Sequence, residues 1–281
     1  MRDQLSLQLE PELAPLPNLP DGLRPMLPRL GSEPFDSADH IFEPAWGGAR
    51  ALAFLGPADA PGSGAVRIVD ADGTEVGAAL PELAGMAVRV DARSAVLDGE
   101  LVAVDDAGRA DAAELRRRLA GQPGRPVAYL AFDLLHLDGR SLLTTPLHRR
   151  RALLRRVLRP GDEVLAVPAI AAEGRALHEA ASAQGIAGVL ARERTSPYLS
   201  GVKSRLWRFI ATSTLPPGVV DLGLARGTGA SRTAERDEGE HVDVDAGPRA
   251  DAGTSPDGRT AANGASPVVA LIRRLPLLFD D

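Results

Sequence analysis

The sequence of 281 residues contains a single lysine, Lys203, among its 32 basic residues. All the others are arginines, whose guanidinium groups stay protonated and are poor nucleophiles. A GC-rich genome explains this bias, because its codons favour arginine, alanine, glycine and proline. The bias leaves Lys203 as the only candidate for any reaction that needs a lysine amine.

Cysteine is absent, which excludes disulfides and thiolate metal sites. No stretch approaches roughly 18 consecutive apolar residues, and the first residues lack the apolar core of a signal peptide. These absences predict a cytoplasmic protein without a membrane span. The formal net charge of −6 argues against strong non-specific binding of nucleic acid, which usually needs a basic surface.

Common catalytic motifs are also missing. The glycine-rich residues 223–232 lack the Lys-Ser/Thr pair of a phosphate-binding loop. The chain has no G-x-S-x-G or H-E-x-x-H motif, and its five histidines do not have metal-ligand spacing. The residues themselves therefore predict no metal site.

Composition divides the chain into four segments. Residues 1–34 are proline-rich and predict an extended lead-in, whereas residues 35–215 have the pattern of a globular domain. Residues 216–265 contain few large apolar side chains, which predicts a disordered linker. Residues 266–281 are apolar again, which fits a strand that docks on the core, a partner-binding peptide or a frayed end.

Short apolar runs and helical patterns follow one another irregularly within the globular segment. The strands are expected at residues 50–55, 65–74, 94–109, 127–139, 186–193 and 204–212, with Asp98-Gly99 separating two short runs in the third. The helices are expected at residues 111–121, 145–161 and 173–185, with Asp111 and Thr145 as N-caps of the first two. This mixed order, with its Asp-Gly turns, predicts an α+β fold built on antiparallel sheets flanked by helices.

Four segments of this region, in order, resemble a known family. They are residues 25–54 (containing FEPAWGGARAL), 95–109 (AVLDGELVAVDDAGR), 127–154 (beginning VAYLAFDLLHLDG) and 185–210 (GIAGVLARERTSPYLSGVKSRLWRFI). Together they resemble the adenylation domains of bacterial ATP-dependent DNA ligases, both stand-alone ligases and ligase modules of end-joining proteins. The resemblance covers about residues 25–212 and implies a covalent nucleotidyltransferase fold, which is ATP-grasp-like.

In that family a lysine attacks the α-phosphate of ATP, forms a lysyl-adenylate and releases pyrophosphate. The adenylate passes to a 5′-phosphate at a nick, and the 3′-hydroxyl then displaces AMP. The resemblance implies ATP and Mg²⁺ as cofactors, and DNA or an active ligase or repair protein as a partner. Such chemistry needs a deprotonated amine and cations that neutralise the phosphates.

The first family motif resembles E-x-K-x-D-G-x-R. By this resemblance Glu43 contacts the adenine amino group, while Gly48 and Arg50 supply the turn and the ribose-side arginine. The place of the nucleophilic lysine is taken by Ala45, and the place of the following acid by Gly47.

The middle motifs are partly kept. The resemblance makes Glu100 the carboxylate that serves the ribose or the metal, and Phe132 the aromatic ring that stacks on adenine. In the family's E-G-V-V-A-K motif, the metal-side glutamate is Ala187 here and the phosphate-side lysine is Arg192, which keeps a charge that can meet a phosphate.

The last motif resembles S-R-x-W-x-K-x-K. The motif residues Ser204, Arg205 and Trp207 are kept. Phe209 and Ala211 stand where the family has lysines. Lys203 and Arg205 are the candidates for DNA contact. Residues 213–281 have no run of five strands that would form the family's oligonucleotide-binding barrel.

These losses fall on one reaction, while the apolar motif positions remain: Val96, Leu97, Leu134, Leu135, Val189 and Leu190. The first hypothesis is therefore a ligase-like domain without lysine adenylation that acts as a binding or regulatory module. The alternative is an active ligase that uses an unusual nucleophile or a partner subunit. A third hypothesis is that the chain binds a nucleotide without reacting with it. Glu43, Arg50, Glu100 and Phe132 also have structural explanations, as a surface acid, a snorkelling arginine, a turn carboxylate and a buried ring.

Overall fold

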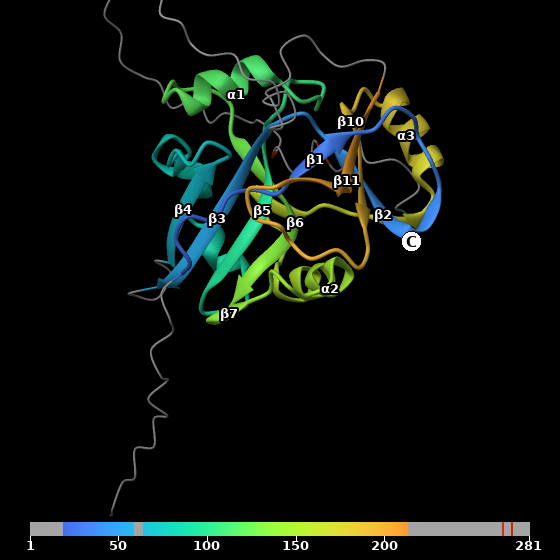
Figure 1. The fold of residues 1–281 in the computed structure, drawn as a ribbon. Coiled ribbons are helices and arrows are strands. Elements are labelled where there is room, and N and C mark those ends of the chain that lie inside the picture. The colour runs from blue at the N-terminus through green and yellow to red at the C-terminus, as the bar shows by residue number, and fades with distance from the viewer. Residues whose placement is uncertain (1–18, 59–63, 213–265, 267–270, 272–281) are drawn as a thin grey trace, which may run out of the picture.

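The computed structural model describes residues 19–58, 64–212, 266 and 271. The predicted linker, residues 216–265, lies outside the described residues, as do all but two residues of the C-terminal segment 266–281. Two sheets with helices around them form the described part (Figure 1), as the α+β prediction requires. The largest apolar cluster takes residues from both sheets, such as Phe42 and Trp207 from one and Leu52 and Leu130 from the other.

The six-stranded sheet has the order β4-β3-β5-β6-β7, with β8 paired to β6. Its strands are β3 (Ala49–Ala58), β4 (Gly64–Asp70), β5 (Ala95–Ala103), β6 (Val127–Leu137), β7 (Arg140–Ser141) and β8 (Val164–Ala166). Its pairs are antiparallel except that of β8 with β6. The expected Asp-Gly turn between β6 and β7 is confirmed, since Asp138 and Gly139 both have positive φ.

The five-stranded sheet has the order β1-β11-β10-β2-β9. Its strands are β1 (Leu27–Leu30), β2 (Ser37–Ala45), β9 (Ile170–Ala172), β10 (Gly188–Glu193) and β11 (Lys203–Ala211). The structure corrects the boundary expected after residue 34, because β1 pairs in parallel with β11 and Met26 before it is fully buried. Pro28 suits this place, since an edge strand tolerates a residue without an N–H donor.

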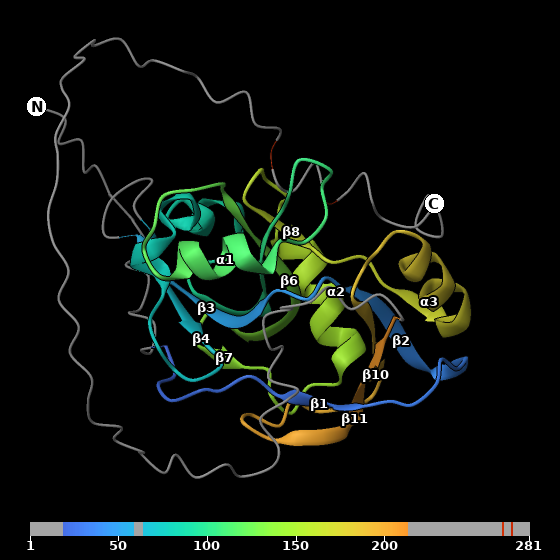
Figure 2. The ribbon, with the colours of Figure 1, turned by 90° about the horizontal axis from the view of Figure 1, so that it is seen from above.

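In the described ranges three α-helices of at least eight residues cover the sheets, and Figure 2 shows α1 and α3 on opposite sides of them. They are α1 (Ala112–Leu119), α2 (Leu147–Val157) and α3 (Gly174–Ala183), and three short 3₁₀ helices are η1 (Gly77–Ala79), η2 (Pro81–Leu83) and η3 (Met86–Arg89). Asp111 caps α1 as predicted, accepting hydrogen bonds from the N–H groups of Ala113 and Glu114. Thr145 does not cap α2, which begins one residue later with Pro146 as its N-cap, and the carbonyl of Thr145 instead accepts from Arg150.

The strand β5 runs without interruption through Asp98-Gly99, which we expected to separate two runs. Gly99 is needed there for a close approach, because a Cβ atom at this position would lie 2.6 Å from the ring of Tyr129. The hydroxyl of Tyr129 donates to the carbonyls of Ala51 and Leu97 and is thereby fixed across the sheet. Here the Asp-Gly pair therefore accommodates a ring and does not form a turn.

We predict that Gly99→Ala lowers the free energy of unfolding by roughly 1–3 kcal/mol, because the added methyl group overpacks the sheet against Tyr129. Urea denaturation of the full chain measures the change. Gly85→Ala is the matched control, since Gly85 has a φ of −82° and its added methyl group would meet nothing within 4 Å. Equal stability of the two variants would contradict the prediction.

Candidate functional site

The loop of Trp46, Gly47 and Gly48 joins β2 to β3 and rests on β5. Gly47 has a φ of 85°, and a Cβ atom at Gly48 would lie 2.0 Å from the carbonyl oxygen of Leu101. The carboxylate of Glu100 accepts hydrogen bonds from the N–H groups of Gly48 and Trp46, the latter at 3.3 Å. Burial raises the pKa of Glu100, while these hydrogen bonds oppose the rise. Glu100 is therefore a carboxylate that holds the loop.

Ala45, at the end of β2, lies in a small apolar cluster. The cluster contains Leu190 and Phe209, and the partly buried Ala211 packs against it. Gly188 of β10 pairs with Ala45 on one side and with Ala211 on the other. Three places at which the resembled family carries lysines are thus neighbours in space, although they lie far apart in the sequence. They share one apolar environment.

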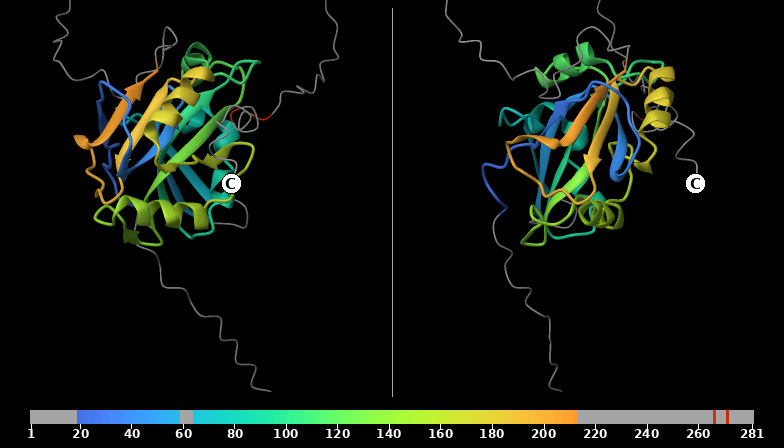
Figure 3. Two further views of the ribbon diagram at one scale, coloured as in Figure 1. Left: turned by 90° about the vertical axis from the view of Figure 1, so that its right-hand side faces the viewer. Right: turned by 45° about the vertical axis from the view of Figure 1, so that its right-hand side comes forward.

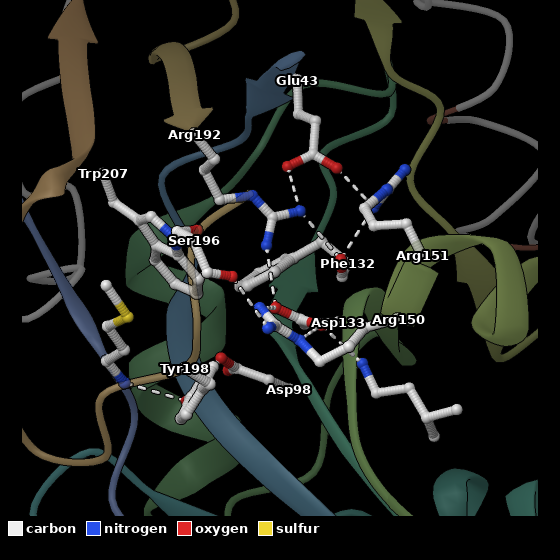
Figure 4. Close-up of polar contacts among 12 residues, drawn as sticks. Glu43, Asp98, Phe132, Asp133, Arg150, Arg151, Arg192, Ser196, Tyr198 and Trp207 are labelled. Atoms are coloured by element: carbon white, nitrogen blue, oxygen red, sulfur yellow. Dashed lines mark hydrogen bonds and ion pairs between the residues drawn. The ribbon is translucent and has the colours of Figure 1, made fainter. Parts of the chain in front are cut away.

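Glu43 is buried between two arginines, and not at the surface as its structural explanation supposed (Figure 4). Its carboxylate forms ion pairs with Arg192 of β10, at 2.5 Å, and with Arg151 of α2. Both guanidinium groups also donate to the carbonyl oxygen of Phe132, and Arg151 donates to that of Val167 as well. The acid expected at the adenine amino group is therefore already paired within the chain.

Asp133 of β6 extends this arrangement. Arg150 donates to both of its carboxylate oxygens, each at 2.8 Å, and Arg192 lies 3.3 Å from one of them. We call Glu43, Asp133, Arg150, Arg151 and Arg192 the buried ion network. Arg192, for which a phosphate contact was expected, is fully buried within this network and contacts carboxylates.

Opposing effects act on the charge of Arg151. Burial disfavours the charged guanidinium, Glu43 favours it and Arg192 disfavours it again. Together these effects lower the pKa of Arg151 to about 10. The group therefore remains protonated at neutral pH, and the buried carboxylates keep a positive partner on the α2 side.

Arg50 makes a second buried ion pair. Its guanidinium donates to both oxygens of Asp98, each at 2.6 Å, and to the carbonyl of Met26. Burial alone would lower the pKa of Arg50, but Asp98 outweighs it and raises the pKa. The hydroxyl of Tyr198 also donates to Asp98 and accepts from the N–H of Met26. Arg50 thus fixes the β1 end of the chain to β3 and β5.

The ring of Phe132, expected to stack on adenine, has arginines of this chain as its neighbours. The guanidinium carbon of Arg50 lies 4.4 Å from the ring centroid, and that of Arg192 lies 5.1 Å from it. The same two groups lie 5.5 and 4.9 Å from the ring of Trp207. These contacts fit cation–π interactions, which gain strength when the groups are desolvated.

Between the two sheets, next to Ala45 and Glu43, a cavity of about 20 Å³ remains. It is lined by Pro28, Glu43, Pro44, Ala45, Arg50, Glu100, Phe132, Val167, Leu190 and Phe209. One water molecule fills such a volume, whereas ligand pockets measure roughly 300–1,000 Å³. Among the described residues, no group of three or more His, Asp or Glu side chains could hold a metal ion. In this arrangement the residues do not fit a nucleotide with its metal.

The remaining predicted residues lie outside this cavity. Ala187 is buried at the start of the β10 segment, and its carbonyl accepts from the N–H of Thr212. Lys203 is half-buried at the start of β11, and Arg205 is exposed. The two sites of DNA contact stay predictions. Arg208 is exposed whereas Phe209 is buried, so the two do point to opposite faces as strand geometry requires.

Sequence reasoning missed Asp98, Asp133, Arg150, Arg151 and Tyr198. All five lie in segments that carried the resemblance, Asp98 and Asp133 as the aspartates of LDGEL and FDLL, but no motif assigned any of them a role. A signal was available in the three consecutive arginines on α2. Three consecutive residues span about 200° of a helix, so not all of them can lie on its exposed face.

Comparisons with known proteins agree with this fold. The family model described as ATP dependent DNA ligase domain matches residues 33–209. A probable DNA ligase of Rhodococcus opacus is 35% identical over 147 residues, which are 51% of this chain and 29% of that protein. The multifunctional non-homologous end joining DNA repair protein LigD of Mycobacterium tuberculosis is 34% identical over 189 residues, 66% of this chain and 24% of that protein.

Solved structures lead to the same family. A mycobacterial DNA ligase D complexed with ATP and MES has a TM-score of 0.58 and 29% identity, covering 67% of this chain and 60% of that one. The ligase domain of Mycobacterium tuberculosis LigD has a TM-score of 0.56 and 29% identity, covering 66% and 58%. The chain therefore belongs to the ATP-dependent DNA ligase domain family, and its fold is that family's nucleotidyltransferase fold. It spans 29% and 24% of the length of these two curated relatives.

No helix in the described ranges is long and apolar enough to cross a membrane.

We predict that Asp133→Asn lowers the free energy of unfolding by about 3–5 kcal/mol, because two buried guanidinium groups lose the charge that balances them. Urea denaturation measures this change. The control is Asp106→Asn, since Asp106 is 94% exposed and its pair with Arg125 is a surface pair. It should change stability by less than about 0.5 kcal/mol. If both variants lost a similar free energy of unfolding, burial of the network would contribute nothing to stability.

We also predict a pH effect at Glu100. Its folded-state pKa is raised, so between 4.5 and that higher value the native chain binds a proton that the unfolded chain has released. The contribution of Glu100 to stability is therefore full at low pH and is lost as the pH rises through this window. Glutamine does not titrate, so Glu100→Gln should lack this pH dependence. The free energy of unfolding of the wild type, measured relative to that of the variant, should therefore fall as the pH rises. Denaturation of both proteins between pH 4 and 7 tests this, and a pH-independent difference would disprove it.

Proposed function

We propose that this chain is a ligase-family domain that no longer carries out lysine adenylation and acts as a non-catalytic binding or regulatory module. The observation that carries the proposal is the apolar cluster around Ala45. The family's reaction needs an amine at this place and cations near the phosphates. The side chains of Leu190 and Phe209 are hydrocarbon and carry no charge, and Ala45 has no reactive group.

The single lysine supports the same conclusion. Lys203 begins β11 and Ala211 ends it, and Ala211 is the residue of that strand nearest to Ala45 in the pairing register. The strand rises by eight residue steps from one to the other, which is roughly 26 Å. An amine at Lys203 would therefore attack from a different part of the sheet from the one where the family places its nucleophile.

The internal pairing of the acidic and basic residues also supports the proposal. Glu43 and Arg192 would have to separate from each other before they could meet an adenine or a phosphate. Separation leaves buried charges without partners, which costs several kcal/mol for each ion. A nucleotide would need to supply that free energy before it gained any contact.

We place this module in DNA repair, with DNA or an active ligase or repair protein as its partner. The support is the similarity to mycobacterial LigD, which is a non-homologous end joining DNA repair protein. Lys203 and Arg205, at the start of β11, remain the proposed DNA contacts. An active ligase that uses Lys203 or a partner's nucleophile is the alternative, and the next experiment separates the two.

We predict that the full chain, incubated with α-labelled ATP and Mg²⁺, carries no label after denaturing electrophoresis. A family ligase that has the motif lysine is the positive control. Covalent label on this chain would contradict the proposal. If that label disappeared in Lys203→Ala, the alternative with Lys203 as nucleophile would replace it.

The double variant Ala45→Lys/Gly47→Asp tests whether the missing groups alone account for the loss. Label on this variant, and none on the wild type, would show that the frame still accepts a nucleotide. Calorimetry of the wild type with ATP and AMP tests non-covalent binding separately. Heat of binding at millimolar nucleotide would show that the buried ion network opens.

A further inference from the structure

A groove of about 600 Å³ lies between α2 and the β6–β7 hairpin, away from the cavity beside Ala45. Figure 3 shows α2, in yellow-green, across the lower end of the molecule, with the hairpin beside it. The apolar part of the groove is formed by Ala152 and by three leucines, Leu137, Leu142 and Leu153. Leu137 and Leu153 are only half-buried, so they leave apolar surface open to a ligand.

Three exposed arginines surround this apolar surface: Arg140 of β7 and Arg149 and Arg156 of α2. None of them forms an ion pair with another residue of the described ranges, although exposed arginines elsewhere do, as Arg109 does with Asp105. The helix α2 itself contains no Asp or Glu. The groove therefore combines uncompensated positive charge with apolar surface.

We propose that this groove binds an acidic peptide segment that carries apolar side chains and belongs to a partner protein. Carboxylates of the segment would pair with the arginines, whose planar guanidinium groups bind carboxylates through two parallel hydrogen bonds. Leu or Phe side chains of the segment would cover Leu137 and Leu153. A nucleic-acid backbone matches the charge of the groove but has no apolar side chains to place on its floor.

The same helix connects the groove to the buried ion network. Arg149 and Arg156 face the groove, whereas Arg150 and Arg151 on the other side of α2 pair with Asp133 and Glu43. A peptide bound along α2 therefore contacts the element that holds the buried carboxylates. This proposal rests on the binding role proposed above, but not on the loss of adenylation.

Fluorescence anisotropy with a labelled peptide of sequence DLFDDLLD tests the proposal on the full chain. We expect saturable binding, with a Kd that rises about tenfold in Arg156→Glu. The matched control is Arg155→Glu, because Arg155 is the exposed neighbour on the same helix, undergoes the same charge change and does not line the groove. It should change the Kd less than about twofold. Arg140→Glu, on β7, repeats the test outside the helix in case a change in α2 unfolds the chain.

Two altered peptides separate the contributions of charge and apolar contact. Replacing Leu and Phe by Ser, or Asp by Asn, should each raise the Kd about tenfold. Absence of saturable binding up to about 1 mM peptide, or an equal loss in Arg155→Glu and Arg156→Glu, would overturn the proposal. So would displacement of the peptide by duplex DNA when the serine peptide binds as well as the original, because the site would then read charge alone.

Self-association that depends on Arg156 and is abolished by the peptide would also overturn it, in favour of a second copy of this chain as the occupant. The ATP-labelling experiment does not involve this groove. Covalent label together with normal peptide binding would refute the proposed loss of adenylation and leave the peptide-binding proposal intact. Absence of both label and peptide binding would refute the peptide-binding proposal and leave the proposed loss of adenylation intact.

Discussion

Asp133 lies on the six-stranded sheet, and its carboxylate pairs with Arg192 on the five-stranded sheet and with Arg150 on α2. Arg192 in turn pairs with Glu43 on β2, which also meets Arg151. An unpaired charge at this buried place would cost several kcal/mol, so the two sheets and α2 are held in the arrangement in which all the pairs meet. The apolar core between the sheets then packs around a polar centre that fixes its register.

The same pairs decide the character of the site. In the ligase family, as the resemblance describes it, charged groups at this place face a nucleotide. Here both carboxylates of the buried ion network are paired with arginines of the same chain, Arg50 is held by Asp98, and the cavity that remains is about 20 Å³. The lysine places have become Ala45, Phe209 and Ala211, which touch one apolar cluster. The buried arginines thus pair with carboxylates of the same chain, whereas the places of the family's lysines are apolar.

Much of the fold could be predicted from the sequence, because the strands and helices are short, regular and bounded by clear signals. Asp111 caps α1, and Asp138-Gly139 turns between β6 and β7. The failures have physical causes that local sequence does not contain. Asp98-Gly99 reads as a turn until the ring of Tyr129, from another strand, occupies the space beside Gly99. The proline-rich lead-in hides β1, because that strand takes its hydrogen bonds from β11, far along the chain.

By itself the sequence determined the family and the missing amine, because both depend on which residues stand at fixed spacings around Glu43, Ala45 and Arg50. It could not decide what surrounds Ala45. Strand register decided that, since β10 lies between β2 and β11 and brings Phe209 and Ala211 beside Ala45. Burial decided the rest. Glu43 and Arg192 read as ligands of a nucleotide along the chain, but packing of the two sheets removes them from water and leaves each as the other's partner.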